Sequence, residues 1–227
     1  MTTATDEGAR DSLEISREQA TDCYRLDPVE AQAIASAFSE APDCRRDPKV
    51  VAAYEALQEQ SDRFFRALTD TDGPGAVQIA FTYLTNPYTS DHELIDAVRN
   101  ERLLEVSAAA SCSERLHPLL GCDLGGPYDR FRAVHDILGH VRTGLGFDRN
   151  GEYVAWRIQD QQYSGLARLA LASELHAEHS VFWTSGTLPE HKACLLRACL
   201  IAWARAGQSS SRPRSSGGFP PNTISAT

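Results

Sequence analysis

The sequence is short of basic side chains. Its 227 residues include 22 Lys and Arg against 31 Asp and Glu, which gives a formal net charge of −9 at pH 7. A non-specific nucleic-acid binder needs a basic face for the phosphates, and an electrostatic membrane anchor needs a basic cluster. The charge therefore argues against nucleic acid and against a membrane surface as partners.

Paired cysteines are also missing. No two cysteines form a C-x-x-C motif, so a zinc knuckle and a thioredoxin-type redox site both lack their signature. Cys194 and Cys199 lie in an apolar helical run, where free cysteine usually behaves as a small buried hydrophobe. We expect reduced thiols rather than a disulfide framework. The six cysteines are Cys23, Cys44, Cys112, Cys122, Cys194 and Cys199.

Long apolar runs and the common catalytic signatures are absent as well. No stretch approaches the roughly 18 uninterrupted apolar residues of a membrane-spanning helix, and residues 1–10 lack the apolar region of a signal peptide. We therefore expect a cytoplasmic protein. The sequence contains no G-x-x-x-x-G-K-[ST], G-x-G-x-x-G or G-x-S-x-G, so P-loop, Rossmann and serine-hydrolase sites lack their motifs.

What remains is the composition of a globular protein, with 42% hydrophobic and 23% charged residues. Residues 1–25 are polar, and residues 207–227 are rich in Ser, Pro and Gly, so both segments are predicted to be disordered. Residues 26–206 are predicted to form a single α-helical domain that is large enough to bury a core.

Apolar residues recur at steps of three and four through most of this domain, which predicts helices. Val77–Tyr83 differs, because its apolar residues alternate as in a strand. The expected class is mainly α, a compact helical domain with at most a short strand or hairpin. The expected helices are 28–41 capped by Asp27, 48–68, 91–106 capped by Ser90, 129–141 capped by Asp129, 152–162 after an Asn150-Gly151 turn, 165–182 capped by Ser164, and 189–206.

Titratable residues gather on the expected helix 129–141. Its apolar residues step by three and four from Phe131 to Val141, and His135 falls at the edge of that face. Asp136 and His140, four residues apart, fall together on the other side. The segment is lean in Lys and Glu, which indicates that another helix covers this second side.

Glu174 lies in an apolar part of the expected helix 165–182. Its neighbours at helical spacing are Ala167, Ala170, Leu171 and Ala177. Burying an unpaired carboxylate costs several kcal/mol, so Glu174 is expected to have a cation, a donor or a proton. Glu178, one turn further on, shares that face and is a second carboxylate or an acceptor that orients a ligand.

Two imidazoles and one carboxylate form the facial triad that holds divalent iron with open positions. His135, His140 and Glu174 are the predicted metal ligands, with Fe²⁺ or another divalent metal as cofactor. Residues five apart lie about 140° apart on an ideal helix, so the two rings converge only if the helix departs from ideal geometry near Gly139. The competing interpretation is two ordinary helix histidines and a carboxylate that pairs with an arginine.

The segment Phe131–His140, FRAVHDILGH, resembles a family of uncharacterised function from bacteriophages and actinobacteria. Its members share F-R-x-V-H-D-x-x-G-H, then G-F-x-x-x-G-E-x-x-A-W, matched here from Gly146 to Trp156, and a helix with a central S/T-E, matched by Ser173-Glu174. The resemblance covers residues 81–196. The resemblance implies a functional role for Glu152. The position of Glu152 at the start of an expected helix is also sufficient to explain a glutamate there, because a carboxylate is favoured at a helix N-terminus.

The order of His135, His140 and Glu174 is also similar, more distantly, to the iron ligands of pterin-dependent aromatic amino acid hydroxylases. This resemblance implies non-haem iron and oxygen activation. No segment here matches the pterin-binding region of that longer domain, so pterin is not carried over.

A rival resemblance is to the HD phosphohydrolases, where metal-activated water attacks a phosphoester. His135-Asp136 would be the doublet, with His117 upstream and Asp160 downstream, but this arrangement leaves Glu174 without a role.

The helix that follows Glu152 offers a further group of candidates. Trp156, Gln159 and Tyr163 step by three and four and are predicted to be either a packed aromatic edge or a pocket wall with polar handles. Arg132 is expected to bind an anionic group of the substrate. His176 and His179 project toward Arg168 and are expected to face solvent or an interface.

Together these patterns predict an oxygenase or hydroxylase that acts on a small molecule. Asp136, Glu152 and Glu178 are the predicted catalytic residues, which orient ligands or move protons. The alternatives are an HD-like metal-dependent phosphohydrolase and a non-catalytic structural or binding protein. The sequence leaves the oligomeric state open.

Overall fold

The structure, a computed structural model, describes residues 20–21, 23–72, 75–108 and 117–206. The predictions of disorder for 1–25 and 207–227 therefore fall largely outside the described residues. Ala20, Thr21 and Cys23 are helical, and Ala20 packs in a small apolar cluster with Leu145 and Val154. The packed part of the chain thus begins before residue 26.

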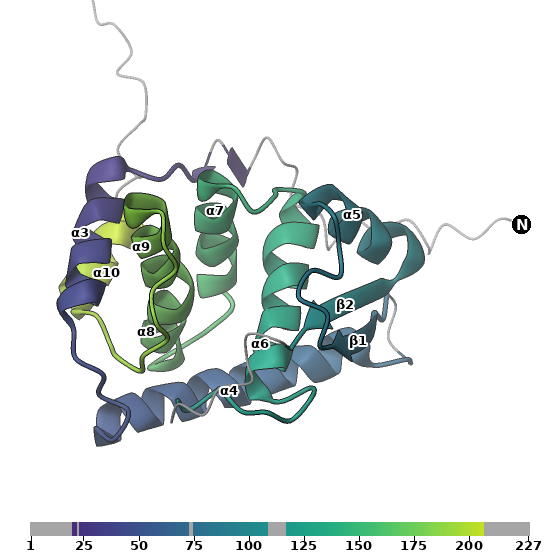
Figure 1. The fold of residues 1–227 in the computed structure, drawn as a ribbon, viewed down its shortest axis with the longest axis horizontal. Helices are drawn as coiled ribbons and strands as arrows, with labels where there is room; N and C mark the ends of the chain where they lie inside the picture. The colour runs from purple at the N-terminus through teal and green to yellow at the C-terminus, as the bar shows by residue number, and fades with distance from the viewer. Residues whose placement is uncertain (1–19, 22, 73–74, 109–116, 207–227) are drawn as a thin grey trace, which may run out of the picture.

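Two aspartate-capped helices open the fold. In α3 (Pro28–Glu40) the Asp27 carboxylate accepts a hydrogen bond from the Val29 amide at 2.7 Å, and in α4 (Pro48–Thr69) Asp47 caps in the same way. A proline at the first helical position follows each cap, where its missing N–H has no cost. Both predicted helices are confirmed. In Figure 1 α4 runs along one side of the molecule, from the α3 end to the sheet.

The only sheet in the described residues is a parallel pair. Strand β1 (Gln78–Thr82) pairs with β2 (Leu103–Ser107), and α5 (Asp91–Asp96) with a π turn, η1 (Ala97–Glu101), forms the crossover. The predicted helix 91–106 was too long, because Arg102 adopts a left-handed conformation at φ 58° and ends it. Residues from Leu103 onward form backbone hydrogen bonds with β1, a long-range partner that local periodicity does not reveal.

The helix that bears the histidines changes its winding halfway. Helix α6 (Pro127–His135) begins two residues before the predicted cap, and Asp129 instead accepts a hydrogen bond from the Gly125 amide at 2.9 Å. The chain continues as a π-helix, η2 (Asp136–Val141), and then enters α7 (Arg149–Asp160). Asp148 caps α7, so Asn150-Gly151 lies in its first turn and is not the predicted loop turn.

The predicted helix 165–182 is likewise three segments. They are α8 (Ala167–Leu171), the π-helix η3 (Ala172–Ala177) and α9 (Glu178–Ser185). Ser164 does not cap it: the N-cap residue of α8 is Leu166, and the Ser164 hydroxyl donates to Gln60 Oε1 at 3.4 Å. The last helix, α10 (Ala198–Ala206), begins nine residues after the predicted start at Pro189. Tertiary contacts hold residues 189–197 in a non-helical path, among them a 2.7 Å hydrogen bond from the Cys44 amide to the Ala193 carbonyl.

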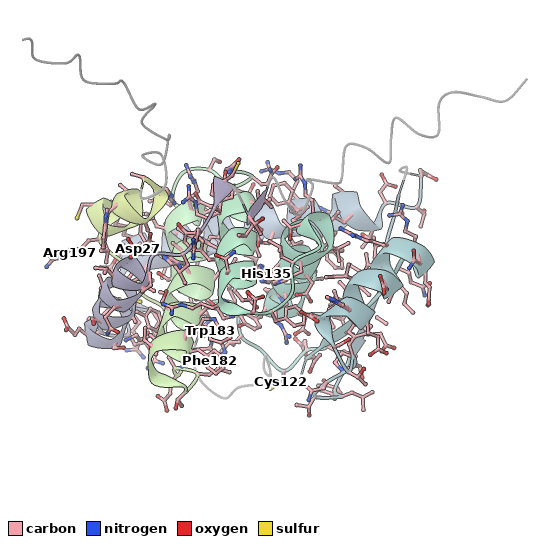
Figure 2. The ribbon with its side chains drawn as sticks, turned by 90° about the horizontal axis from the view of Figure 1, so that it is seen from above. Asp27, Cys122, His135, Phe182, Trp183 and Arg197 are labelled. Carbon is pink, nitrogen blue, oxygen red and sulfur yellow. The ribbon has the colours of Figure 1, made fainter. Side chains whose placement is uncertain are left out.

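The core falls into two main apolar clusters. One lies among α3, α4, α7 to α10 and contains the fully buried Trp156, and the other joins the sheet to α6 and η2. Figure 2 shows His135 in the interior, between these two parts of the molecule. The mainly α class is confirmed, and no helix in the described ranges is long and apolar enough to cross a membrane.

Candidate metal centre

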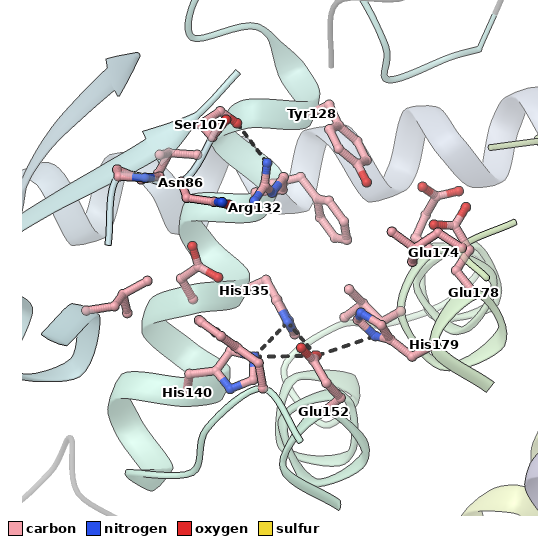
Figure 3. Close-up of a pocket in the computed structure, with 18 of the residues that line it drawn as sticks. Asn86, Ser107, Tyr128, Arg132, His135, His140, Glu152, Glu174, Glu178 and His179 are labelled. Atoms are coloured by element: carbon pink, nitrogen blue, oxygen red, sulfur yellow. Dashed lines mark hydrogen bonds and ion pairs between the residues drawn. The ribbon is translucent and has the colours of Figure 1, made fainter. Parts of the chain in front are cut away.

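A cavity of about 380 Å³ opens where α6, η2, α7, η3 and α9 meet the segment 85–88 (Figure 3). Its wall contains His135, Asp136, His140, Glu152, Glu174, Glu178, His179, His191 and Arg132, together with apolar and aromatic side chains. Most of the site residues predicted from sequence therefore share one cavity. They do not form one cluster, however, but two.

The first cluster, called the imidazole centre, consists of His135, His140 and Glu152. His135 Nε2 lies 3.1 Å from His140 Nε2, and Glu152 Oε2 lies 3.3 and 3.5 Å from these two nitrogens. The three side chains are almost fully buried. Three donor atoms thus converge on one point from the end of α6, from η2 and from α7.

The outer nitrogen of each ring has its own partner. His135 Nδ1 donates to the amide oxygen of Gln159 at 2.8 Å, and His140 Nδ1 donates to the Leu145 carbonyl at 3.0 Å. In the neutral rings the lone pairs are then on the two Nε2 atoms. Two lone pairs and a carboxylate oxygen face one another, so a proton or a metal ion is required among them.

The spacing of these atoms fits a metal ion. Ligand bonds of about 2.1 Å put neighbouring donor atoms about 3.0 Å apart at right angles and about 3.4 Å apart at tetrahedral angles. Two of the three distances in the imidazole centre, 3.1 and 3.3 Å, lie in that range, and the third, 3.5 Å, is slightly longer. Backbone or amide acceptors on the outer nitrogens are the usual companions of metal-binding histidines.

The π-helix η2 is what brings the two rings together. In a π-helix residue i+5 is hydrogen bonded to residue i, so side chains five apart lie on the same face. His135 and His140 have this spacing, and their rings meet edge to face at 4.9 Å between centroids. The departure from ideal helix geometry that the sequence required near Gly139 is therefore present.

Gly139 also sets the distance between η2 and α7. A Cβ atom added at this position would lie 2.7 Å from Ala155 Cβ, closer than real Cβ atoms approach. The two helices can pack this tightly only with glycine there. Because α7 carries Glu152 and Gln159, this contact positions the carboxylate and the amide against the histidines.

His140 and Glu152 stabilise each other's charged forms in the imidazole centre. Burial by itself lowers the pKa of His140, but the Glu152 carboxylate outweighs it and raises this pKa to about 9. Burial by itself raises the pKa of Glu152, but the charges of His179 and His140 bring it well below its usual value. Without a metal ion, a proton on His140 pairs this ring with the Glu152 carboxylate.

Two side chains close the imidazole centre from outside. His179 Nδ1 lies 3.4 Å from Glu152 Oε2, and the Phe147 ring meets His140 edge to face at 4.7 Å (Figure 3). The expectation that His179 faces away is corrected. It assumed an unbroken α-helix, whereas the π turn η3 holds an extra residue per turn and rotates everything beyond it.

The second cluster, called the carboxylate centre, consists of Glu174, Glu178, His117 and His191. Glu178 Oε1 lies 3.0 Å from His191 Nδ1, and Glu174 Oε1 lies 3.4 Å from His117 Nε2. The Tyr54 hydroxyl donates to Glu174 Oε1 at 2.5 Å. Burial, followed by the charge of Glu174, raises the pKa of Glu178 to about 7.

Glu174 is therefore placed differently from its prediction. The expected burial among Ala and Leu is present, with a donor in Tyr54, but within the described residues Glu174 makes no contact with His135 or His140. The carboxylate beside the two rings is that of Glu152, 12 residues after His140 in the chain.

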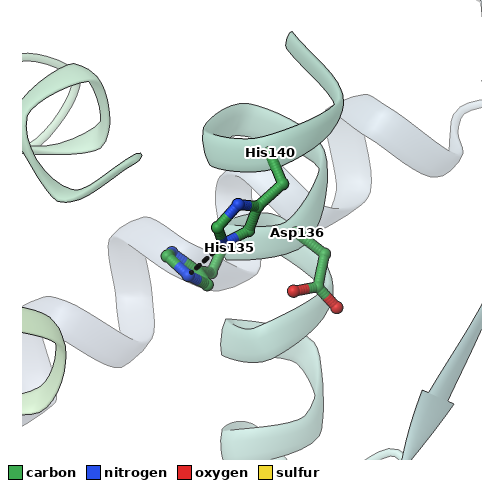
Figure 4. A group of neighbouring side chains, drawn as sticks. All are labelled: His135, Asp136 and His140. Atoms are coloured by element: carbon green, nitrogen blue, oxygen red, sulfur yellow. Dashed lines mark hydrogen bonds between the residues drawn. The ribbon is translucent and has the colours of Figure 1, made fainter. Parts of the chain in front are cut away.

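Asp136 and Arg132 lie on the cavity wall next to the imidazole centre. His135, Asp136 and His140 each offer a ligand atom within 4.8 Å of the other two, and Figure 4 shows the Asp136 carboxylate set apart from the two rings. Burial, partly offset by the charge of Arg132, raises the pKa of Asp136. Arg132 itself donates to the Ser107 carbonyl at 2.7 Å.

The predicted pocket wall of Trp156, Gln159 and Tyr163 lies behind the cavity. Trp156 is fully buried and stacks on His176 with ring centroids 4.1 Å apart, and Tyr163 Oη lies 2.9 Å from Ser61 Oγ. Gln159 touches the site only through His135. None of the three lines the cavity. His176 is also buried, 3.0 Å from Glu30, so the expectation that it faces solvent was wrong.

The set of residues that an HD phosphohydrolase needs is not assembled. Asp160 is buried in ion pairs with Arg168 and Arg205, away from the cavity wall. His117 contacts Glu174 rather than the His135-Asp136 doublet.

Three side chains near the cavity were not predicted to be site residues. Tyr54, His179 and His191 reach the cavity region from parts of the chain with no motif, and only the tertiary structure brings them there. No family model matches the chain, and no curated protein and no solved structure matches it.

Proposed function

We propose that the chain is a mononuclear non-haem metal enzyme, an oxygenase or hydroxylase whose ion is divalent iron held by His135, His140 and Glu152. The observation that supports this most is the convergence of three donor atoms within 3.1 to 3.5 Å of one another. The outer nitrogens are already bonded, so the inner lone pairs are available to an ion.

Two imidazoles and one carboxylate are the donor set of the facial triad, which leaves positions open for dioxygen and substrate. Hydroxylation puts one oxygen atom of O₂ into a C–H bond and reduces the other to water. The balance needs two electrons and two protons, RH + O₂ + 2e⁻ + 2H⁺ → ROH + H₂O. The electrons come from a separate organic two-electron reductant.

The side chains of this protein have defined roles in the proposal. Gln159 and the Leu145 carbonyl hold the rings in the tautomer that presents Nε2. Phe147 packs edge to face against the His140 ring and helps to hold it in place. Asp136, on the cavity wall beside the two rings, is the group that holds and transfers the protons that the reaction consumes.

The cavity suits a small-molecule substrate. Its volume of about 380 Å³ lies within the range of about 300–1,000 Å³ that is usual for such sites. Arg132 is the candidate partner for an anionic group of the substrate, and Tyr128 and Phe131 supply apolar wall. The acidic net charge and free cysteines are consistent with a cytoplasmic enzyme that binds neither nucleic acid nor membrane.

The test is anaerobic loading of the full chain with Fe²⁺, followed by addition of nitric oxide, which occupies an open position and gives a ferrous-nitrosyl signal in electron paramagnetic resonance. We expect the wild-type signal to disappear in His140→Ala and Glu152→Gln. Removal of an orienting residue lowers metal affinity by about 10–100-fold. Removal of a ligand itself is expected to lower iron affinity by more than that.

Glu174→Gln decides between the two candidate carboxylates. If Glu152 is the third ligand, Glu174→Gln keeps the signal, whereas loss in Glu174→Gln with Glu152→Gln unaffected returns that role to Glu174. His92→Ala, an exposed histidine with 70% of its side chain accessible, is the matched control. A wild-type protein that binds no iron contradicts the proposal and leaves a structural role, with a protonated His140 paired to Glu152.

A further inference from the structure

A metal ion at the imidazole centre does not account for the four buried or partly buried Glu and His side chains of the carboxylate centre. Its side chains come from four places: Glu174 from η3, Glu178 from α9, and His117 and His191 from non-helical segments. Glu174, Glu178 and His191 each offer a ligand atom within 4.8 Å of the other two. The three line the cavity that contains the imidazole centre, in a different part of its wall (Figure 3).

Two buried atoms in this cluster have no hydrogen-bond partner. They are Glu174 Oε2 and His117 Nε2, and the side chains of Glu174 and His117 are only 1% and 2% exposed. His117 Nε2 points at Glu174 from 3.4 Å without forming a hydrogen bond. His117 Nδ1 is the acceptor for the Leu119 amide at 3.3 Å, so it is the other nitrogen, Nε2, that the cluster faces.

The two carboxylates also lack a lysine or arginine partner. Among the described residues neither Glu174 nor Glu178 forms an ion pair with Lys or Arg. Tyr54 donates one hydrogen bond to Glu174 Oε1, which leaves Oε2 unpaired. A buried atom without a partner costs free energy, and a cation bound among these groups removes that cost.

We propose that Glu174, Glu178 and His191, together with His117, bind a second divalent metal ion, Zn²⁺, in the same cavity. Two carboxylate oxygens and two imidazole nitrogens form the donor set. That mixture suits first-row transition metals better than Ca²⁺ or Mg²⁺, which prefer oxygen alone. A monovalent ammonium group of a substrate would leave the imidazoles without a role.

Tyr54 orients the proposed ligand set in the way that outer residues orient metal ligands elsewhere. Its hydroxyl fixes one oxygen of Glu174, so the free oxygen is directed to the ion, and its ring meets His117 edge to face at 5.2 Å. Glu174 is thus kept as a metal ligand, as its sequence setting predicted, but with partners other than His135 and His140.

The experiment measures zinc per chain by elemental analysis. The full chain is stripped with a chelator, loaded with Zn²⁺ and passed through a desalting column. We expect two equivalents for wild type, one for Glu178→Gln, one for His191→Ala and one for His140→Ala. The combination of His140→Ala with Glu178→Gln is expected to bind none.

The outcomes are distinguishable for the two centres. A wild-type value of one equivalent that His140→Ala abolishes overturns the second site. A second equivalent that survives both Glu178→Gln and His191→Ala overturns it as well. If His140→Ala binds as much zinc per chain as wild type, the imidazole centre does not bind zinc. Glu178→Gln and His191→Ala then still decide whether the carboxylate centre does.

Two variants protect the test against misfolding. Glu178→Gln preserves the shape of the buried side chain, and His191 is partly exposed, with 26% of its side chain accessible, so its removal disturbs the core little. Glu55→Gln, an exposed glutamate on α4, is the matched control and is expected to keep two equivalents. Far-ultraviolet circular dichroism of each variant verifies that the helices are intact.

Discussion

The imidazole centre and the carboxylate centre share one cavity but balance charge in opposite ways. At the imidazole centre Glu152 faces two rings and His179 nearby, and the shared field raises the pKa of His140 to about 9. At the carboxylate centre burial, followed by the charge of Glu174, raises the pKa of Glu178 to about 7. A neighbouring carboxylate thus favours the charged form of a base in the first centre, and in the second it favours the neutral form of an acid.

The difference explains why the two centres depend on a cation to different extents. A single proton on His140 pairs this ring with Glu152 in the imidazole centre, and the two outer ring nitrogens have acceptors of their own. The carboxylate centre leaves Glu174 Oε2 and His117 Nε2 without partners. Metal binding therefore displaces a proton from the imidazole centre, whereas in the carboxylate centre it also supplies a partner for two unpaired buried atoms, Glu174 Oε2 and His117 Nε2.

Gly139→Ala is expected to produce the largest difference in metal binding between the two centres. The added Cβ would lie 2.7 Å from Ala155 Cβ and would push η2 away from α7. Overpacking of this kind costs about 1–3 kcal/mol. We expect that loss in urea unfolding, together with weaker metal binding at the imidazole centre and unchanged binding at the carboxylate centre.

The double variant Gly139→Ala with Ala155→Gly tests the cause. It restores the space between the helices and is expected to recover metal binding in the imidazole centre. If Gly139→Ala unfolds and binds metal like the wild type, the close contact does not position the centre.

A smaller effect, confined to the imidazole centre, is expected from Gln159→Leu. The substitution removes the acceptor for His135 Nδ1 at 2.8 Å and frees the ring to rotate. Loss of an orienting partner lowers metal affinity by about 10–100-fold. Chelator competition measures this, with exposed Gln32→Leu as the control, and equal weakening of both centres would contradict the assignment.

The smallest effect is expected from Tyr54→Phe, the corresponding change at the carboxylate centre. Glu174 Oε1 loses its 2.5 Å donor, and a buried hydrogen bond of this kind contributes about 1–3 kcal/mol. We expect affinity for the second ion to fall by roughly tenfold, with the imidazole centre unchanged. Exposed Tyr83→Phe is the control; an effect at the imidazole centre alone would show that Tyr54 acts elsewhere.

Much of the fold was predictable from local patterns. The spacing of apolar residues and the Asp-Pro pairs at 27–28 and 47–48 predicted α3 and α4, because caps and helical faces depend on residues close in sequence. The errors lie where distant partners decide. Leu103–Ser107 is a strand because β1 lies beside it, and residues 189–197 are non-helical because α3 and α9 hold them.

The site was predictable in part for the same reason. His135 and His140 were correctly singled out as a pair, and the need for a distorted helix near Gly139 followed from their spacing alone. The π turn in η3 was not foreseen, since nothing in the sequence from Ala172 to Ala177 distinguishes it from an α-helix. That turn is why His179 faces Glu152 against expectation.

The sequence by itself determined the mainly α fold class and the residue types, His and Glu, that line the cavity. It could do so because the spacing of apolar residues and the Ala and Leu neighbours of Glu174 are local features of the chain. Only the tertiary structure decided which carboxylate meets which histidine. Glu152 and Glu174 both fit a ligand role by type, and they were separated only by the packing of η2 on α7 and of η3 beside Tyr54. Convergence of side chains depends on helix winding and on contacts between distant segments, which a linear pattern does not record.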